Sequence, residues 1–428
     1  MAFPETRAPR RLTVGATALA TAALAFSSIG VTAQDTSMGS NEHEDVPKAA
    51  VQNLVDYCEE QTGFSIAVNV NDHNTFQNQI SSYLQGTPDD IVKWFAGNRN
   101  RFFAAQGLLE PVTDVWTDSI GDSLTDGLKA ASTAADGEQY FVPVYNYPWV
   151  VMYRKSVFDE NGYAVPATMD EFKALGDQMA ADGLVPLALG DQDGWPAMGT
   201  FDILNMRQNG YQFHIDLMEG REQWSDPRVQ KVFEIWRDDL LPYTQVGAPG
   251  RTWQDAAKAM LVDKTAGMYF LGTFAAEQAA VEDIPDIGFF PFPSLGTDFD
   301  SENAIDAPID GFMLSAGPEN PEAAKAFLAC AATPEAQLAY VLTPGIGSVA
   351  VSPAADPSGY NDLQAASAAV LADAGSIAQF LDRDARSDFA GPSGMQGFLI
   401  EFLSNPDQDL AALLGGIQAY FESLPPEA

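Results

Sequence analysis

Hydrophobic and polar residues alternate between helical and strand-like spacing along the chain. An apolar stripe with the period of a helix runs through 46–62 and ends at Gly63. Residues 65–70 have the β-branched composition of a strand. A second helical stripe at 74–84 is followed by a strand at 91–95. This succession of helices and strands predicts an α/β fold.

The same alternation continues through the rest of the chain. Thr168 has the position of a helix cap, and the tail from Asn361 is predicted to be mainly helical. The Ala-rich composition of the tail suits helices and carries no chemical signal. Further strands are predicted at 185–189, 266–271 and 287–292, and further helices at 200–209, 227–240, 253–262, 320–330 and 334–342.

A dense aromatic and β-branched run at 139–154 is broken by Pro143 and Pro148. Proline lacks the N–H group that a central strand donates to its neighbour, so this run is not one regular strand. Its length and its two breaks favour a crossing between two lobes.

Length and charge limit the classes of function. The chain has 428 residues, which indicates two or three domains, or two lobes that share one chain. With 22 Lys and Arg against 59 Asp and Glu, the formal net charge is −37. Such a surface repels phosphate backbones, so we expect no nucleic-acid partner. Adaptation to salt and a bias in genome composition both remain possible origins of the charge.

The N-terminus predicts export. Three Arg residues within 7–11 precede an uncharged run from Leu12 that ends with the small residues of 31–33. This pattern is typical of a signal peptide, 1–33, cleaved after Ala33; a transmembrane anchor is the alternative. No Cys lies near that point to carry a lipid, so we expect an exported protein in the periplasm or cell envelope.

Cys58 and Cys330 are the two cysteines of the chain. In an oxidising compartment they form either a disulfide or two buried thiols, and spacing alone does not decide. The usual zinc-binding spacings of Cys and His are absent, and the three His residues are scattered. We therefore predict no metal and no cofactor.

Several stretches of the chain resemble the extracellular solute-binding proteins of carbohydrate ABC transporters, the maltose-binding-protein-like group. One is the loop DQDGWPA at 191–197. The others lie at 39–63, 70–116, 141–163 with 166–172, 264–278 and 307–328. They follow one another in the order found in the family.

The resemblance implies a two-lobed periplasmic-binding-protein fold with a hinge and a ligand cleft between the lobes. The N-terminal lobe is expected at 34–146 and 300–348, and the C-terminal lobe at 147–299 and 349–428. This topology puts Cys58 and Cys330 on helices of the same lobe, which favours the disulfide.

A cleft for sugars needs aromatic platforms for C–H faces, beside carboxylates and amides for hydroxyl groups. Such side chains follow several predicted strands, where ligands gather in α/β sheets. Trp195 lies between Gly194 and Pro196, which favours a place in the cleft over one in a regular element. For Trp94 and Tyr147, packing in the core is the equal alternative. The predicted ligand-binding residues are Asn41, Glu42, Trp94, Phe95, Arg99, Tyr145, Trp149, Asp193, Trp195, Thr273, Phe274 and Asp310.

These features predict a monomeric receptor, not an enzyme, that captures a sugar and delivers it to the membrane permease subunits of an ABC transporter. One alternative is a secreted glycoside hydrolase that uses paired carboxylates, Asp191 with Asp193 or Asp89 with Asp90. Each pair is so close in sequence that it flanks a glycosidic bond only if the chain turns sharply between its members. A sugar-sensing or adhesive module is a second alternative.

Overall fold

The computed structural model describes residues 35–425, and within them the strands form three sheets. The predicted export signal at 1–33 lies outside the described residues. The strands are β1 (Thr36–Ser40), β2 (Ile66–Val70), β3 (Ile91–Phe95), β4 (Leu109–Glu110), β5 (Val142–Asn146), β6 (Trp149–Arg154), β7 (Val185–Ala188), β8 (Ala266–Gly272), β9 (Ile287–Phe290), β10 (Ala304–Asp306), β11 (Ile309–Ser315), β12 (Val349–Ala350) and β13 (Ser376–Ala378).

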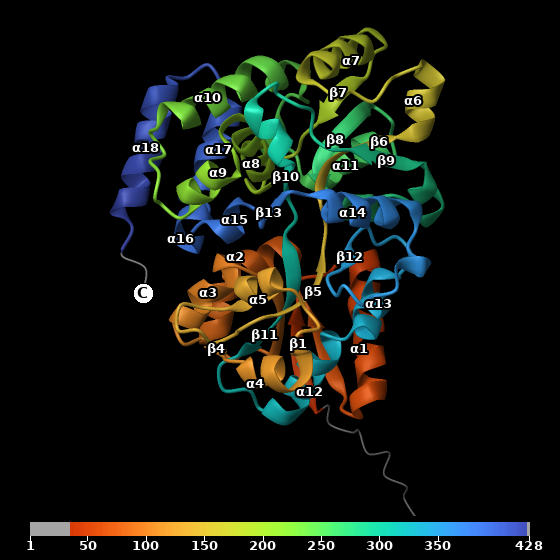
Figure 1. Ribbon diagram of the computed structural model, residues 1–428, viewed down its shortest axis with the longest axis vertical. Helices are drawn as coiled ribbons and strands as arrows, with labels where there is room; N and C mark the ends of the chain where they lie inside the picture. The colour runs from red at the N-terminus through yellow and green to blue at the C-terminus, as the bar shows by residue number, and fades with distance from the viewer. Residues whose placement is uncertain (1–34, 426–428) are drawn as a thin grey trace, which may run out of the picture. The chain divides into compact units, whose positions relative to one another are not determined.

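The largest sheet has the order β12-β5-β11-β3-β1-β2, with β4 paired to β11. A four-stranded sheet has the order β7-β8-β6-β9, and β10 pairs with β13. Within 35–425, the largest sheet lies in the lower half of Figure 1 and the four-stranded sheet in the upper half. The α/β prediction is confirmed, with two sheet-centred lobes.

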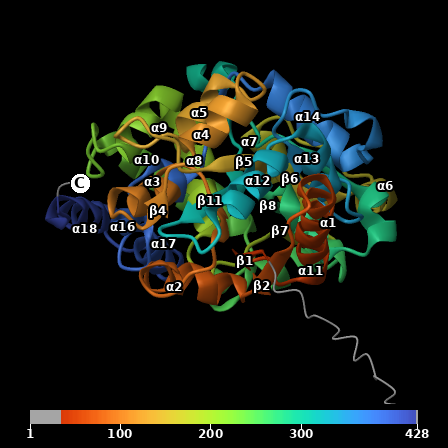
Figure 2. The same cartoon turned by 90° about the horizontal axis from the view of Figure 1, so that it is seen from below.

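Helices cover both sheets. Figure 2 looks at the largest sheet from below, with α1, α3, α4 and α5 around its strands. None of the helices within 35–425 combines the length and the apolar character needed to cross a membrane. The α-helices are α1 (Asp45–Thr62), α2 (His73–Gln85), α3 (Asn98–Ala105), α4 (Thr113–Val115), α5 (Asp126–Ser132), α6 (Lys155–Asn161), α7 (Met169–Ala181), α8 (Pro196–Asn209), α9 (Tyr211–Met218), α10 (Pro227–Ile235), α11 (Trp253–Leu261), α12 (Pro321–Ala331), α13 (Pro334–Val341), α14 (Asp362–Asp373), α15 (Leu381–Asp384), α16 (Ser387–Ala390), α17 (Met395–Ser404) and α18 (Leu410–Ser423).

Local sequence explains where many of these elements begin and end. Gly63 closes α1 in the left-handed conformation, with φ 76°, which glycine adopts without steric cost. Thr168 and Glu171 form a capping box at the start of α7, as the position of Thr168 predicts.

Several strands, most of them short, were absent from the sequence prediction, and helix α8 begins earlier than predicted. Strand β1 has the sequence TSMGS, which lacks β-branched apolar residues, yet it is buried between β2 and β3. Strand β11 was also missed. Helix α8 begins at Pro196 rather than at residue 200, because Pro suits the first turn and the Asp191 carboxylate accepts the Ala197 N–H at 2.8 Å.

The run at 139–154 is divided between the two main sheets, as its two prolines predict. Strand β5 belongs to the largest sheet and β6 to the four-stranded sheet, with Tyr147 and Pro148 between them. The chain therefore crosses between the lobes at this point. The residue bounds given above for the lobes stay a prediction; β12, which begins just after residue 348, pairs with β5 of the largest sheet.

A disulfide joins Cys58 on α1 to Cys330 on α12, with their Cα atoms 5.8 Å apart. Both side chains are buried, and both helices pack beside the largest sheet. The pairing that the resemblance favoured is confirmed.

Candidate functional site

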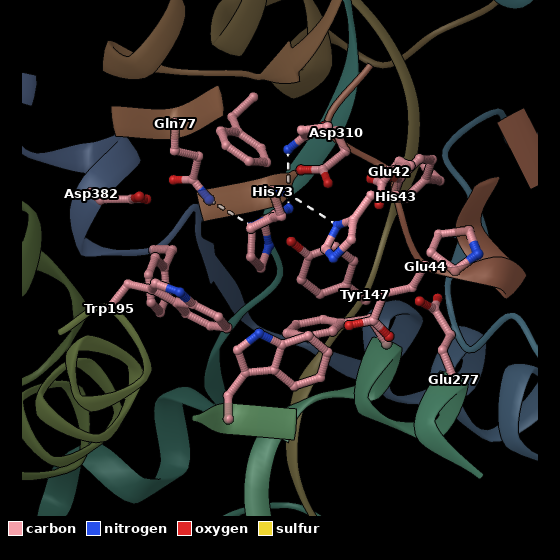
Figure 3. A pocket seen from close by; sticks show the side chains of 18 of the residues that line it. Glu42, His43, Glu44, His73, Gln77, Tyr147, Trp195, Glu277, Asp310 and Asp382 are labelled. Atoms are coloured by element: carbon pink, nitrogen blue, oxygen red, sulfur yellow. Dashed lines mark hydrogen bonds between the residues drawn. The ribbon is translucent and has the colours of Figure 1, made fainter. Parts of the chain in front are cut away.

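A cavity lies where the two lobes meet, and strands from both lobes end at its walls (Figure 3). It encloses about 880 Å³ of empty space, its open mouth included. Among the residues predicted to bind ligand, those that line it are Asn41, Glu42, Phe95, Tyr145, Trp149, Trp195, Phe274 and Asp310.

Strand register places three of these residues side by side in the largest sheet. Asp310 pairs with Phe95 of β3 on one side and with Tyr145 of β5 on the other. Strand β1 ends at Ser40, so Asn41 and Glu42 follow at the same edge. Parallel strands β1 and β3 thus present their carboxyl ends to the cavity, the position expected of a ligand site in an α/β sheet.

A buried network of charges surrounds the Asp310 carboxylate. Lys93 Nζ lies 3.1 Å from Asp310 Oδ2 and also contacts Glu42 Oε1. Arg383 Nη1 lies 2.7 Å from Asp310 Oδ1. Burial alone would raise the pKa of Asp310, but Lys93 and Arg383 bring it below its ordinary value. Asp310 is therefore ionised and held in one orientation.

Amides and a histidine extend this polar wall. The ring of His73 lies between two amide groups, that of Asn41 at 3.2 Å and that of Gln77 at 2.6 Å. Burial lowers the pKa of His73, so the ring is neutral. A neutral imidazole accepts at one nitrogen only. Gln77, whose Oε1 accepts from Arg99, donates to His73 Nε2. Nδ1 therefore carries the ring hydrogen, and the Asn41 amide turns its oxygen to it.

The opposite wall consists of aromatic rings from the second lobe. Trp149 stacks on Phe380 with ring centroids 4.8 Å apart, and the edge of Trp195 meets Trp149 at 6.4 Å. Trp253 meets Phe274 at 5.2 Å. Within 35–425, the buried indole N–H groups of all three tryptophans lack an acceptor. The wall therefore offers both flat apolar faces and free donors.

One end of the cavity is acidic. Glu44 accepts a hydrogen bond from Gln254 Nε2 at 3.0 Å and another from Gln278. Burial, followed by the charges of Glu42 and Glu44, raises the pKa of Glu277 well above its ordinary value. In Figure 3, Glu44 and Glu277 lie at the end opposite Trp195 and Asp382.

Trp94 and Arg99 were predicted to bind ligand, but they stand behind the cavity wall. Successive strand residues point to opposite faces, so Trp94 turns away from Phe95. It is fully buried and donates to the Arg99 carbonyl at 3.0 Å. Arg99 instead holds two lining residues, Gln77 through a 2.9 Å hydrogen bond and Asp382 through a 3.4 Å ion pair.

Thr273 and Asp193 also lie outside this cavity. Thr273 is buried, and its hydroxyl donates to the Gly347 carbonyl at 2.9 Å. Asp193 lines a second, adjoining cavity. Asp89 and Asp90 have structural partners: Asp89 accepts from Tyr83 at 2.5 Å, and Asp90 accepts from Thr36 at 2.8 Å.

Several lining residues were missed by the sequence analysis. Arg383 and Phe380 come from the Ala-rich tail, whose composition carried no chemical signal, yet the tail supplies side chains to the cavity. Tyr340, on α13, stacks on Tyr145 with ring centroids 4.4 Å apart. Trp253 is the first residue of α11, and from the sequence it was assigned only to a helix. These segments lie far apart in the sequence, so their meeting at the cavity is seen only in the folded chain.

Metal binding finds no support among the described residues. Within 35–425, no group of three or more His, Cys, Asp and Glu side chains is arranged to hold an ion. The charged groups of the cavity instead pair with one another.

Known proteins of similar fold include the bacterial solute receptor AcbH, described as having an exclusive substrate preference for β-D-galactopyranose. It is 45% identical, with a TM-score of 0.87 over 91% of this chain and 98% of that chain. A chitin oligosaccharide binding protein, at 20% identity and a TM-score of 0.79, shares the fold over 90% of this chain and 98% of its own.

Curated relatives are more distant. An uncharacterized ABC transporter extracellular-binding protein of Pyrococcus horikoshii is 26% identical over 60% of this chain and 57% of its own length. The chain spans about half the length of the curated relatives it matches. The model of one family, the bacterial extracellular solute-binding proteins, matches residues 39–338. With strands, cavity and this match in agreement, the chain belongs to the bacterial extracellular solute-binding protein family.

Proposed function

We propose that the chain is an exported receptor that captures a pyranose sugar in the cavity and delivers it to the permease subunits of an ABC transporter. D-Galactopyranose is the first candidate ligand, because AcbH resembles the chain over nearly its whole length. The receptor makes and breaks no bond.

The observation that carries this proposal is the pairing of two unlike walls. The aromatic wall of Trp149, Trp195 and Phe274 suits the C–H faces of a pyranose ring. The polar wall offers the fixed Asp310 carboxylate as an acceptor for hydroxyl groups, with the Asn41 amide beside it. A pyranose has apolar C–H groups on the two faces of its ring and hydroxyl groups around its edge, so it matches both walls.

The charge network makes Asp310 a binding group rather than the proton donor of a hydrolase. A glycosidase needs a carboxylic acid placed to give its proton to the leaving oxygen. Asp310 is ionised between Lys93 and Arg383, which suits an acceptor of ligand hydrogen bonds. Asp310 therefore stays an ionised hydrogen-bond acceptor before and after the ligand enters.

We expect the two lobes to close over the ligand, because each wall of the cavity comes mainly from a different lobe. The polar wall belongs mainly to the largest sheet, and the aromatic wall to the four-stranded sheet and its helices. A ligand that touches both walls favours the closed arrangement by the contacts it makes only there. The permease would recognise that arrangement.

Titration calorimetry of the mature chain with D-galactose, D-glucose and D-mannose tests the proposal. We expect one hexose to bind, and a ligand at a hundredfold excess over its dissociation constant to add about 2.7 kcal/mol of apparent stability. Absence of binding to every sugar in a broad panel would overturn it. Release of reducing ends from oligosaccharides would instead favour the hydrolase.

Two further experiments test the partners. Co-purification with permease subunits, dependent on sugar, distinguishes a transport receptor from a sugar-sensing or adhesive module. Sedimentation of the mature chain should give a monomer.

A further inference from the structure

One residue of the cavity wall, Phe380, has a backbone conformation that is rare for a residue with a side chain. Its φ is 108° and its ψ is 144°. At such a positive φ the Cβ atom crowds the neighbouring backbone, so the conformation persists only where surrounding groups hold it. Among the non-glycine residues of 35–425 with a positive φ, Phe380 is the one that lines the cavity. The groups that hold it therefore bear on the site.

Two carboxylates hold the peptide groups on either side of Phe380. Asp202 Oδ2 accepts the Leu381 N–H group at 2.7 Å. On the other side, Asp384 Oδ2 accepts the Gln379 N–H group at 2.8 Å. The Phe380 carbonyl in turn accepts the Asp384 N–H group at 2.9 Å. The backbone of Phe380 is thus fixed before and after its Cα atom.

Asp202 is the more distant of the two carboxylates, since it lies on α8, 179 residues before Leu381. Leu381 is the first residue of α15, so its N–H group has no partner within that helix. Asp202 is fully buried and lines neither cavity. The bond to Leu381 is the one hydrogen bond that its side chain makes within 35–425. A carboxyl group is costly to bury, and this one acts on the peptide group that follows Phe380.

The ring of Phe380 depends on this support more than its neighbour in the same turn does. It forms part of the aromatic wall by stacking on Trp149, with ring centroids 4.8 Å apart. Arg383, which also lines the cavity, is anchored separately through its 2.7 Å bond to Asp310. Loss of the Asp202 carboxylate therefore frees Phe380, while Arg383 keeps its own partner.

We propose that Asp202 is a positioning residue for the ligand: it holds Phe380 in this conformation, so that the ring lies against Trp149 before a sugar enters. The inference rests on the proposed function for the identity of the ligand. A wall that is already formed spares the ligand the free-energy cost of ordering it. Without the bond to Leu381, Phe380 returns to an ordinary backbone conformation, and its ring leaves the wall.

A double-mutant cycle measured by titration calorimetry tests the inference. The probe is D-galactose, or the hexose of the panel above that the parent protein binds most tightly. Asp202→Ala should bind it at least tenfold more weakly than the parent does. Phe380→Gly removes both the ring and the steric cost of a positive φ, so it should also bind weakly. Adding Asp202→Ala to Phe380→Gly should then change the affinity by less than twofold.

Two further variants separate positioning from general stability. Asp202→Asn should bind within threefold of the parent, because the amide oxygen still accepts the Leu381 N–H group. Burial and the charge of Asp306 raise the pKa of Asp202 well above its ordinary value, so an uncharged amide resembles the carboxyl group it replaces. Asp90→Ala is the matched control, since Asp90 is a buried carboxylate that accepts the Glu319 N–H group at 2.6 Å, at the end of β3 away from the cavity. It should lower the free energy of unfolding and leave the affinity unchanged.

Amide hydrogen exchange reports on the same contact without a ligand. Exchange in the segment 376–386 should be faster in Asp202→Ala than in the parent, and unchanged in Asp202→Asn and Asp90→Ala. If Asp202→Ala does not fold, Asp384→Ala removes the bond on the other side of Phe380 and takes its place in the cycle.

Three results would overturn the inference: unchanged affinity of Asp202→Ala, unchanged exchange in that variant, or the same tenfold loss in the parent and in the Phe380→Gly background. The last result would mean that Asp202 acts through the fold as a whole. Absence of sugar binding by the parent protein is a different failure, because it overturns the proposed function while exchange still shows whether Asp202 holds Phe380.

Discussion

Arg383 Nη1 donates to Asp310 Oδ1 over 2.7 Å, and this bond ties the C-terminal tail to the start of β11. The same guanidinium donates to the Ile309 carbonyl at 2.8 Å and to the Tyr147 hydroxyl at 3.1 Å. Tyr147 lies between β5 and β6, so one buried side chain contacts two segments near the crossings between the sheets. Asp310 is the anion that contacts both Arg383 and Lys93.

Replacing Asp310 by Asn leaves two buried cations with less compensating charge. Removal of one partner from a buried ion pair typically costs about 3–5 kcal/mol. We expect Asp310→Asn to lower the free energy of unfolding by about 3 kcal/mol and to abolish measurable sugar binding. Urea unfolding and calorimetry measure the two effects.

Asp216→Asn is the control, because Asp216 pairs with the exposed Arg221. Exposed pairs contribute about 0–1 kcal/mol, so this variant should unfold almost as the parent does. An Asp310→Asn protein as stable as the control would show that the buried network does not depend on this carboxylate.

Trp195→Ala should weaken sugar binding by roughly 2 kcal/mol or more, because the variant removes a ring that forms one end of the cavity. Trp195→Phe keeps an aromatic face but loses the unpartnered indole N–H, so an intermediate affinity is expected. Calorimetry with the tightest sugar gives the comparison. Unchanged affinity in Trp195→Ala would remove the ring from the site.

The position of a strand was predictable from the sequence where the strand had its own apolar pattern. Residues 91–95 predicted β3 directly, whereas β1, with small and polar residues, gave no such pattern. Its burial comes from its neighbours β2 and β3 on either side. Tertiary pairing, not local propensity, makes it a strand.

The site was predictable as far as side chains follow strand ends. Phe95 was found this way, whereas Tyr145 was predicted from the crossing between the lobes and Asp310 from its place after Pro308; register explains why the three meet. The error at Trp94 arose because both residues of a strand end were assigned to one face. Arg383 gave no indication of its role, since its guanidinium donates hydrogen bonds to residues 73 or more positions away in the chain.

Removal of the disulfide should destabilise the chain without altering the cavity. Cys58 and Cys330 are 272 residues apart, and in the chain-entropy model so long a loop contributes at most on the order of 5 kcal/mol. We expect Cys58→Ala/Cys330→Ala to unfold at lower temperature and to bind sugar as the parent does. Thiol titration of unfolded, unreduced parent should find no free thiol; two free thiols would disprove the bond.

Asp191 makes stability depend on pH. Burial raises the pKa of Asp191 to about 8 in the folded chain, above its ordinary value of 3.8, so the folded state holds this proton over that range. The stability that this proton contributes is complete below pH 3.8 and is lost as the pH rises through about 8. Asp191 Oδ1 accepts the Ala197 N–H, which an Asn side chain also does, while Oδ2 has no partner within 35–425.

Asp191→Asn removes this titration and preserves the cap of α8. The thermal midpoint of the variant, measured relative to the parent, should therefore rise steadily from pH 5 to pH 8.5. Asp216→Asn supplies a baseline, since Asp216 is partly exposed and its pKa is lowered rather than raised by Arg221. If the thermal midpoints of the parent and of Asp191→Asn changed in parallel with pH, Asp191 would already be ionised in the folded chain at pH 5. Burial would then not raise its pKa as described.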